Sequence, residues 1–376
     1  MQLGSYDACV VGAGPAGAIA ARVLARAGAR VALVAAARTA LPVPIGETIP
    51  PAARSVLVRL GIDGCLSAAG HLPSAGNISR WGSKEEAGRE SILDCHGPGW
   101  HVDRKRFDAY LISESECAGA TLVRATFDSA SWSTARSWKL QIRRQDRLEE
   151  ICARYVVDCT GRSAQLAIAA GAQRRVYDKL VAVWALLELL PTARGRAFDD
   201  EDRRTYVEAA PEGWWYSARV PGRRRVLAYF TDGDLLHSRI GQSVGGFMAY
   251  LAEFPYLRNL APWSDYRAVA EPVRVPAMST RLNRAHGAGW VAAGDAAHCF
   301  DPLSSQGILA SIIGGNNAAA ALIASHASDP EALGAYQAQL NVGYAHYLAE
   351  RHRYYWDEQR WNQNRFWRRR HHAYLS

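Results

Sequence analysis

The chain has 376 residues, 49% hydrophobic content and a formal net charge of +8, which suits one large two-part enzyme with a full core. Its seven cysteines are dispersed and never spaced as Cys-x-x-Cys, which disfavours a zinc site or a disulfide framework and fits reduced thiols. The first residues lack a signal-peptide pattern, and no uninterrupted apolar run reaches membrane-spanning length. We therefore expect a cytoplasmic protein with no membrane partner and no metal, and a monomer by default.

An apolar strand over residues 8–11 leads into Gly12-x-Gly14-x-x-Gly17 and then a helix over residues 15–27. Gly12 permits a tight turn, Gly14 lets the backbone approach a pyrophosphate, and Gly17 lets the helix pack on the strand. The pyrophosphate would sit at the positive end of the helix. The residues expected to bind the nucleotide here are Gly12, Gly14, Pro15, Ala16 and Gly17.

The next strand, over residues 30–35, should end near an acidic residue that holds the adenosine ribose. The chain has Ala35-Ala36-Ala37-Arg38 instead. Arg38 can reach a ribose or phosphate oxygen, but no carboxylate is present there. We therefore expect the cofactor to be retained weakly, with purification partly as apoprotein.

Late in the chain, a strand over residues 289–293 is followed by a Gly-Asp pair at Asp295. Asp295 can accept hydrogen bonds from a ribityl or ribose hydroxyl. Pro302 is expected to cap the start of a helix near Gly307, and Pro302, Ser305 and Gly307 are expected to contact the cofactor. The amides of that helix start can hold negative charge on the O2/N1 edge of an isoalloxazine ring. An NAD dehydrogenase has no reason to carry this second motif. The two motifs together therefore predict FAD.

A third motif lies between these two. Residues 102–111 read Val-Asp-Arg-x-x-Phe-Asp-x-x-Leu, a helix start in which Arg104 is expected to approach the FAD. The alternative for Arg104 is a surface ion pair with Asp108, four residues later on the same helix.

Over nearly the full length, these motifs resemble the flavoprotein monooxygenase and halogenase superfamily. Within it, four segments resemble the flavoprotein maturases of tryptophylquinone enzymes, the LodB, GoxB and QhpG type: Gly46-Glu47-Thr-Ile-Pro-Pro51, Trp81-Gly-Ser83, Gly213-Trp-Trp-Tyr-Ser217 and Asp301-Pro-Leu-Ser-Ser-Gln-Gly307. The resemblance implies an FAD monooxygenase that hydroxylates a tryptophan of a partner protein precursor through a flavin C4a-hydroperoxide. O2 would be the cosubstrate, and NADH, NADPH or a flavin reductase would supply electrons.

Two other functions are weighed against this one. A halogenase, or a hydroxylase of a small aromatic metabolite, would share the fold. Halogenases resemble one another in a Trp-x-Trp-x-Ile-Pro strand and a lysine over the channel, whereas this chain has a differently spaced strand at Trp214 and only Lys84 roughly placed among four lysines. A flavin-fold protein that only binds a precursor, through its basic tail, is the second alternative.

Candidate residues for the chemistry come from two groups. The walls of the substrate pocket are expected from aromatic residues, although tryptophans in a sheet can simply be core: Trp81, Trp214, Trp215 and Tyr216. A base must accept the proton that the indole ring loses, and Glu47 and His298 are the candidates. Each also has a structural alternative, since His298 can brace a turn and Glu47 can hold loop amides.

The fold class expected is α/β: a Rossmann-like FAD-binding domain with a parallel sheet, an inserted and mostly antiparallel substrate domain, and a C-terminal helical segment. We assign residues 1–73, 101–175 and 271–330 to the first, 74–100 and 176–270 to the second, and 331–376 to the third.

The last 26 positions hold seven arginines interleaved with three tryptophans. Such a pattern can bind single-stranded nucleic acid, but the flavin motifs explain the protein without it. We expect this segment to pack on the FAD domain, with an acidic protein partner as the second possibility, and no nucleic acid.

Overall fold

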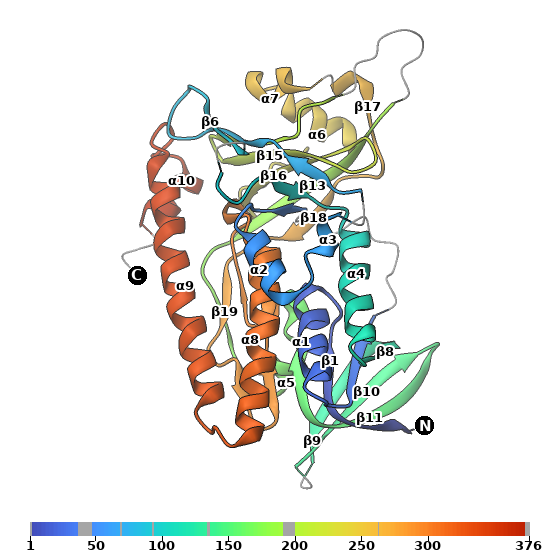
Figure 1. Cartoon of the computed structure of the whole chain (residues 1–376). Helices are drawn as coiled ribbons and strands as arrows, with labels where there is room; N and C mark the ends of the chain where they lie inside the picture. Colours follow the sequence, from blue (N-terminus) through green and yellow to red (C-terminus); the bar gives the residue numbers. More distant parts are fainter. Residues whose placement is uncertain are drawn as a thin grey trace.

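The computed structural model describes residues 2–36, 47–67, 70–91, 94–133, 136–190, 200–261 and 263–372. These residues form two large β-sheets and two three-stranded sheets, with helices on the faces of the large sheets (Figure 1). The α/β architecture expected from the sequence is confirmed.

The first large sheet has eight strands and a parallel centre. Its strands are β1 (Gln2–Val11), β2 (Val31–Ala35), β8 (Thr121–Arg124), β9 (Thr126–Trp132), β10 (Trp138–Arg144), β11 (Arg147–Asp158), β20 (His286–Gly287) and β21 (Trp290–Ala292). β1 pairs in parallel with β2 and β11, β2 with β8, and β11 with β21. β9, β10 and the first half of β11 form an antiparallel extension. Cys9 and Val10 are fully buried, as expected for a parallel strand covered on both faces.

The second large sheet is mostly antiparallel and lies above the first in the view of Figure 1. Its strands are β5 (Gly76–Arg80), β6 (Ala87–Glu90), β13 (Leu180–Leu189), β14 (Arg204–Ala210), β15 (Gly213–Val220), β16 (Arg224–Asp232), β17 (Tyr266–Ala268) and β18 (Val273–Pro276). We call it the substrate sheet. β18 falls beyond the boundary expected at residue 270, yet it pairs with β13 of this sheet.

Two small sheets connect the large ones. Their strands are β3 (Thr48–Ile49), β4 (Leu72–Ser74) and β7 (Gly99–His101) in one, and β12 (Arg174–Val176), β19 (Thr280–Leu282) and β22 (His298–Cys299) in the other. Glu47 directly precedes β3, and His298 is the first residue of β22.

Helices cover both large sheets. They are α1 (Pro15–Arg26), α2 (Ala53–Leu60), α3 (Gly64–Ser67), α4 (Arg104–Cys117), α5 (Gln165–Ala169), α6 (Val244–Leu251), α7 (Pro255–Leu260), α8 (Gly307–Ala327), α9 (Ala332–Asp357) and α10 (Arg365–His372). α1 packs against α4 and α8, and α9 packs along α8. α6 and α7 lie on the outer face of the substrate sheet (Figure 1).

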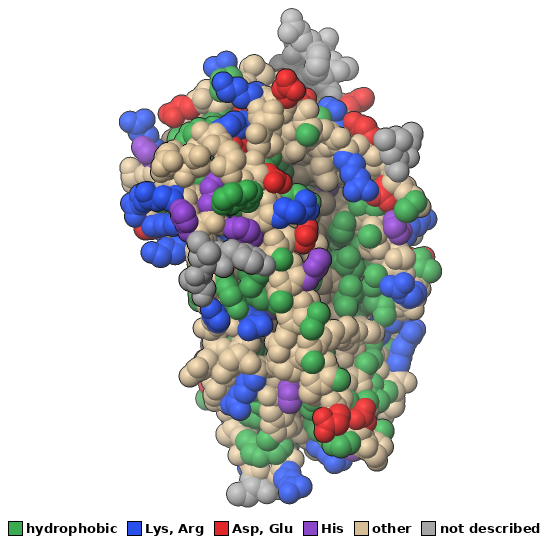
Figure 2. Space-filling model, turned by 90° about the vertical axis from the view of Figure 1, so that its left-hand side faces the viewer, with side chains coloured by type: hydrophobic (Ala, Val, Ile, Leu, Met, Phe, Trp, Pro, Cys, Tyr) green, Lys and Arg blue, Asp and Glu red, His purple; other side chains and the backbone are tan. Residues whose placement is uncertain are grey.

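The C-terminal segment divides between the two parts of the molecule. α9 runs along α8, as expected for packing on the FAD domain, but α10 packs on the substrate sheet, where Trp367 donates to the carbonyl of Ala210 at 2.9 Å. Figure 2 shows basic and histidine side chains gathered on the upper part of this side of the molecule, with a hollow beside them.

α8 is the one helix of the described residues that is long and apolar enough to cross a membrane. The expectation that no uninterrupted apolar run reaches that length still holds, because Asn316 and Asn317 interrupt α8. Its small, apolar residues pack against α1 and α9, which accounts for the same composition. Helices at the core of a protein routinely have this character.

Candidate functional site

The first glycine turn lies at the carboxyl end of β1 and is closely packed from behind. Gly12 has a φ of +104°, and a Cβ there would lie 2.1 Å from the carbonyl oxygen of Cys159. A Cβ on Gly17 would lie 1.7 Å from the oxygen of Gly12. A Cβ on Gly14, by contrast, would meet none of the described atoms within 4 Å. Only glycine allows the close packing at Gly12 and Gly17. At Gly14, the described residues leave space in front of α1.

Two helices begin without a side-chain cap from the described residues. α1 begins at Pro15 with neither a side-chain cap nor an acidic residue in its first turn. α8 begins at Gly307 in the same way, and a Cβ there would again meet no described atom within 4 Å. The first amides of a helix carry partial positive charge and bind anions. The two starts therefore fit a pyrophosphate and the electron-rich edge of a flavin.

The short helix η4 (Gly294–Ala296) brings these helix starts together. A Cβ on Gly294 would lie 2.7 Å from the Cβ of Ala16 in α1 and 3.3 Å from the hydroxyl of Ser311 in α8. A Cβ on Gly315 would lie 2.2 Å from the carbonyl oxygen of Ala16. Asp295 therefore directly follows a glycine that packs between the first turn of α1 and the second turn of α8.

Asp295 lies among three arginines. Burial raises the pKa of its carboxyl group, while the charges of Arg162, Arg104 and Arg174 oppose that rise. Arg162 Nε is 3.9 Å from the carboxylate. Because 38% of the side chain remains exposed, we expect an ionised carboxylate at neutral pH. The sequence reasoning missed Arg162 and Arg174, although Arg162 directly follows the glycine that ends the turn after β11.

Arg104 forms the ion pair with Asp108 and also lies near Asp295, while its approach to the FAD stays a prediction. It donates to Asp108 at 3.1 Å, the i,i+4 pair, and it also lies close enough to Asp295 to influence its pKa. Asp103 caps α4 and accepts from Arg224 of the substrate sheet at 3.3 Å. The start of α4 is thus fixed to both parts of the molecule.

The loop before α8 begins with a 3-10 turn, η5 (Pro302–Ser304), instead of continuing directly into the helix. Ser305 follows with a φ of +50°, and α8 then begins at Gly307 as expected. Pro302 therefore starts the turn and does not cap the helix itself. Arg38 lies outside the described residues.

Glu47 is 3% exposed and lies between the FAD-binding part and the substrate sheet. The hydroxyl of Tyr216, on β15, donates to its carboxylate and lies 3.0 Å from the hydroxyl of Thr48. Burial and the Glu47 charge raise the pKa of Tyr216 well above its usual value. Tyr216 therefore remains a neutral hydrogen-bond donor to the buried carboxylate.

His298 points away from Asp295. Its ring packs against Phe300, with centroids 4.7 Å apart, and against Tyr344 of α9. Cys299, the next residue of β22, instead places its thiol 3.1 Å from the carbonyl oxygen of Asp295. Burial lowers the pKa of His298 to about 4, so the ring is neutral. This placement favours the bracing role over the catalytic one.

Of the four aromatic residues expected in one pocket, Trp81, Trp214 and Tyr216 belong to one cluster, and Trp215 lies on the opposite face of the sheet. Successive residues of a strand point to opposite faces, and Trp214 and Trp215 are neighbours on β15. Trp215 packs against Phe247 of α6 on the outer face. Trp214 and Trp81 pack against Tyr355 and Trp367 of the C-terminal segment. Only Tyr216 reaches Glu47.

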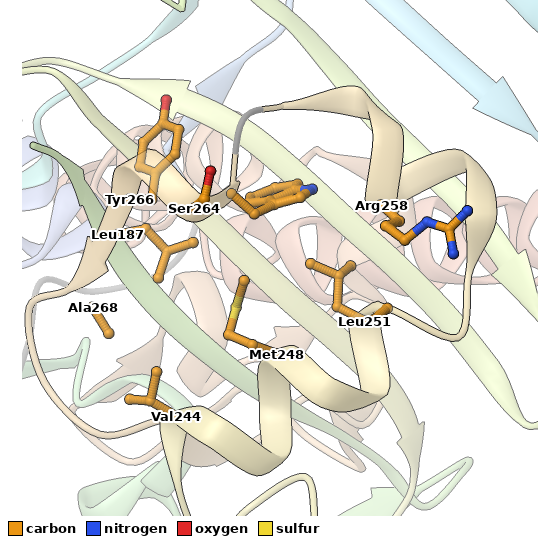
Figure 3. Close-up of a pocket in the computed structure, with 10 residues that line it drawn as sticks. Leu187, Val244, Met248, Leu251, Arg258, Ser264, Tyr266 and Ala268 are labelled. Carbon is orange, nitrogen blue, oxygen red and sulfur yellow. The ribbon is translucent and has the colours of Figure 1, made fainter. Parts of the chain in front are cut away.

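An apolar pocket of about 340 Å³ opens on the outer face of the substrate sheet (Figure 3). Side chains of β13, α6, α7 and the β17 region line it, with Leu187, Met248 and Leu251 among them. Because Leu187 shares its face of the sheet with Trp215, this pocket lies across the sheet from Tyr216 and Glu47. It is separate from the nucleotide site.

The chain is similar to known flavin-dependent proteins. The FAD binding domain family matches residues 5–239. LodB of Marinomonas mediterranea, a proposed FAD-dependent oxidoreductase, is 28% identical over 374 residues, which cover 98% of this chain and 97% of LodB. The flavin-dependent halogenase armH4 of Armillaria mellea is 24% identical over 348 residues, 84% of this chain and 64% of that protein.

Solved structures share the fold. The myxobacterial chondrochloren halogenase CndH has a TM-score of 0.85 and 22% identity, covering 97% of this chain and 86% of CndH. The peptidyl tryptophan dihydroxylase QhpG has a TM-score of 0.78 and 24% identity, covering 98% of this chain and 79% of QhpG. The tight glycine turn and the two uncapped helix starts fit FAD. The chain therefore belongs to the FAD binding domain family and is a flavin-dependent oxidoreductase of the monooxygenase type.

Proposed function

We propose that this protein is an FAD monooxygenase that hydroxylates a tryptophan side chain of a partner protein precursor during tryptophylquinone biogenesis. The observation that carries the proposal is the correspondence with LodB, which extends over 98% of this chain and 97% of LodB without the extra length of the halogenase armH4. The likeness in fold to QhpG, named as a peptidyl tryptophan dihydroxylase, supports the same substrate class.

The starts of α1 and α8 together with Asp295, which we call the nucleotide cradle, would each bind a different part of FAD. The amides at the start of α1 would hold the pyrophosphate, Asp295 would accept from the ribityl chain, and the start of α8 would favour negative charge on the reduced ring. FAD, when bound and reduced, supplies the activated oxygen. NADH, NADPH or a flavin reductase would provide the electrons.

Glu47 is our candidate for the base. It is a buried carboxylate that accepts a hydrogen bond from Tyr216 at the junction of the nucleotide cradle and the substrate sheet. We propose that Glu47 takes the proton lost from the indole ring, while Tyr216 holds the carboxylate in place. General-base catalysis of this kind contributes roughly 10²–10⁴-fold.

The lysines argue against halogenation. All four lysines, Lys84, Lys105, Lys139 and Lys179, are exposed at the surface. A lysine placed over a channel between flavin and substrate would have to be buried or line a cleft. We therefore favour hydroxylation over halogenation, which proteins of the same fold also carry out. A cytoplasmic location stays part of the proposal, supported by seven free cysteines.

The test reconstitutes the protein with FAD and a reductant in air and adds a tryptophan-containing precursor of a quinone enzyme. Intact mass is recorded with and without chloride or bromide. A gain of one or two oxygen atoms on the precursor, lost in Glu47→Gln with FAD still bound, is the expected result. Halide incorporation, or turnover of only a free aromatic compound, would overturn the proposal. Binding of the precursor without any mass change would favour a non-catalytic binding protein.

A further inference from the structure

Asp301 opens the loop that leads to α8 and is only 1% exposed. One carboxylate oxygen, Oδ1, accepts from the amide of Leu303 at 3.0 Å and so caps η5. The other, Oδ2, accepts two hydrogen bonds from α9: from the hydroxyl of Tyr355 at 2.9 Å and from Nε of Arg351 at 3.2 Å. The carboxylate of Asp301 therefore joins the loop from Pro302 to Gly307, which we call the flavin loop, to α9.

A third residue of α9 holds the same loop. The amide of Asp301 donates to the hydroxyl of Tyr347 at 2.7 Å, and that hydroxyl lies 2.7 Å from the hydroxyl of Ser279. Tyr347, Arg351 and Tyr355 are spaced four residues apart, so they share one face of the helix. Arg351 also pairs with Asp178 at 2.9 Å, which balances its charge.

The same network reaches the substrate sheet. Nε1 of Trp214, on β15, donates to the hydroxyl of Tyr355 at 3.1 Å. Tyr355 is fully buried, so its hydroxyl has no access to water as a replacement partner. Two residues along the same strand, Tyr216 donates to Glu47. One hydroxyl group thus connects the substrate sheet, α9 and the loop before α8.

We propose that Tyr355 and Arg351 are positioning residues: through Asp301 they fix the loop from Pro302 to Gly307 and hence the place where the start of α8 meets the flavin. The proposal rests on the FAD binding described above, although neither residue belongs to the nucleotide motifs. Loosening the loop moves the amides of α8 away from the ring. Negative charge on the reduced flavin is then less stabilised, and the reduction potential falls.

The test compares two variants that each remove one buried tyrosine hydroxyl. Tyr355→Phe breaks the link to Asp301. Tyr229→Phe is the matched control, because Tyr229 is 1% exposed and its hydroxyl bonds to Tyr250 at 3.3 Å on the outer face of the substrate sheet. The part of this hydrogen-bond loss that falls on the FAD-bound state weakens FAD binding, by roughly tenfold where most of it does.

Two quantities are measured: the dissociation constant for FAD by fluorescence, and the reduction potential of the flavin at saturating FAD. We expect Tyr355→Phe to raise the dissociation constant for FAD roughly tenfold and to lower the reduction potential of the flavin. We expect Tyr229→Phe to change neither quantity. A role in stability alone would leave the potential of fully loaded protein unchanged. Equal values in wild type and Tyr355→Phe would overturn the proposal.

A second variant keeps the test decisive. If Tyr355→Phe does not fold, Asp301→Asn removes the charge that Arg351 and Tyr355 bind while keeping the size of the side chain, and the same two measurements apply. An unchanged potential in Asp301→Asn would equally overturn the proposal. Neither measurement uses a tryptophan substrate, so failure of the hydroxylation experiment would leave this result standing.

Discussion

The contact between α1 and α8 can be tested with a single methyl group. In Gly315→Ala the new Cβ would lie 2.2 Å from the carbonyl oxygen of Ala16. Ordinary contacts between such atoms begin at about 3.4 Å, so the helices must separate by roughly 1 Å. Overpacking of this kind costs about 1–3 kcal/mol, against a gain of up to about 1 kcal/mol from replacing glycine in a helix.

The displacement acts on the nucleotide site as well as on stability, since Ala16 lies in the first turn of α1. We expect Gly315→Ala to lower the urea midpoint and to weaken FAD binding roughly tenfold for each 1.4 kcal/mol carried into the site. Unfolding is followed by circular dichroism on the apoprotein, and FAD binding by fluorescence.

Two other glycines provide graded controls. In Gly314→Ala the Cβ would lie 3.3 Å from the amide nitrogen of Gly294, a tight contact that a small shift relieves. In Gly343→Ala, on α9, it would meet no described atom within 4 Å. We expect Gly343→Ala to be neutral or stabilising and Gly314→Ala to be intermediate. If Gly315→Ala is as stable as Gly343→Ala and binds FAD equally well, the close approach of the two helices is refuted.

Three further predictions concern the cofactor and pH. Asp295→Ala should abolish FAD retention, and unchanged flavin absorbance after gel filtration would contradict the placement of the cofactor. Ala35→Glu, at the end of β2, should restore an acceptor for the adenosine ribose and tighten FAD binding roughly tenfold, measured by fluorescence titration. Burial lowers the pKa of His298 and of His101 to about 4 from 6.5, so the unfolded chain binds more protons below pH 6.5 and stability is lost as pH falls from about 6.5 toward 4. His298→Gln should flatten this loss in urea midpoints measured from pH 8 to 4.5.

The nucleotide cradle could be predicted from the sequence because its determinants are local. A strand, a glycine turn and a helix start are encoded within a few residues, and so are the Gly-Asp pair at Asp295 and the helix start at Gly307. The roles of Gly314 and Gly315 could not be predicted in this way. They depend on a helix almost 300 positions earlier in the chain, and nothing nearby in the sequence distinguishes them from helix-weakening glycines.

The substrate side was harder to predict for a related reason. Trp214, Trp215 and Tyr216 are adjacent, and the alternation of a strand already implies that they cannot share one face. Which face meets Glu47 depends on how β15 pairs with its neighbours and on which helices cover the sheet. The sequence shows neither, and the hydrogen bond between Tyr216 and Glu47 spans 169 positions.

The basic C-terminal segment illustrates how charge in a sequence differs from charge at a surface. Six of the arginines between residues 351 and 370 form ion pairs with carboxylates of the same chain: Arg351, Arg353, Arg360, Arg365, Arg369 and Arg370. Three of the carboxylates, Asp232, Asp301 and Glu358, are buried. A cation that is already paired contributes little further attraction to an acidic partner. The segment therefore fixes the substrate sheet to the loop before α8 within the molecule.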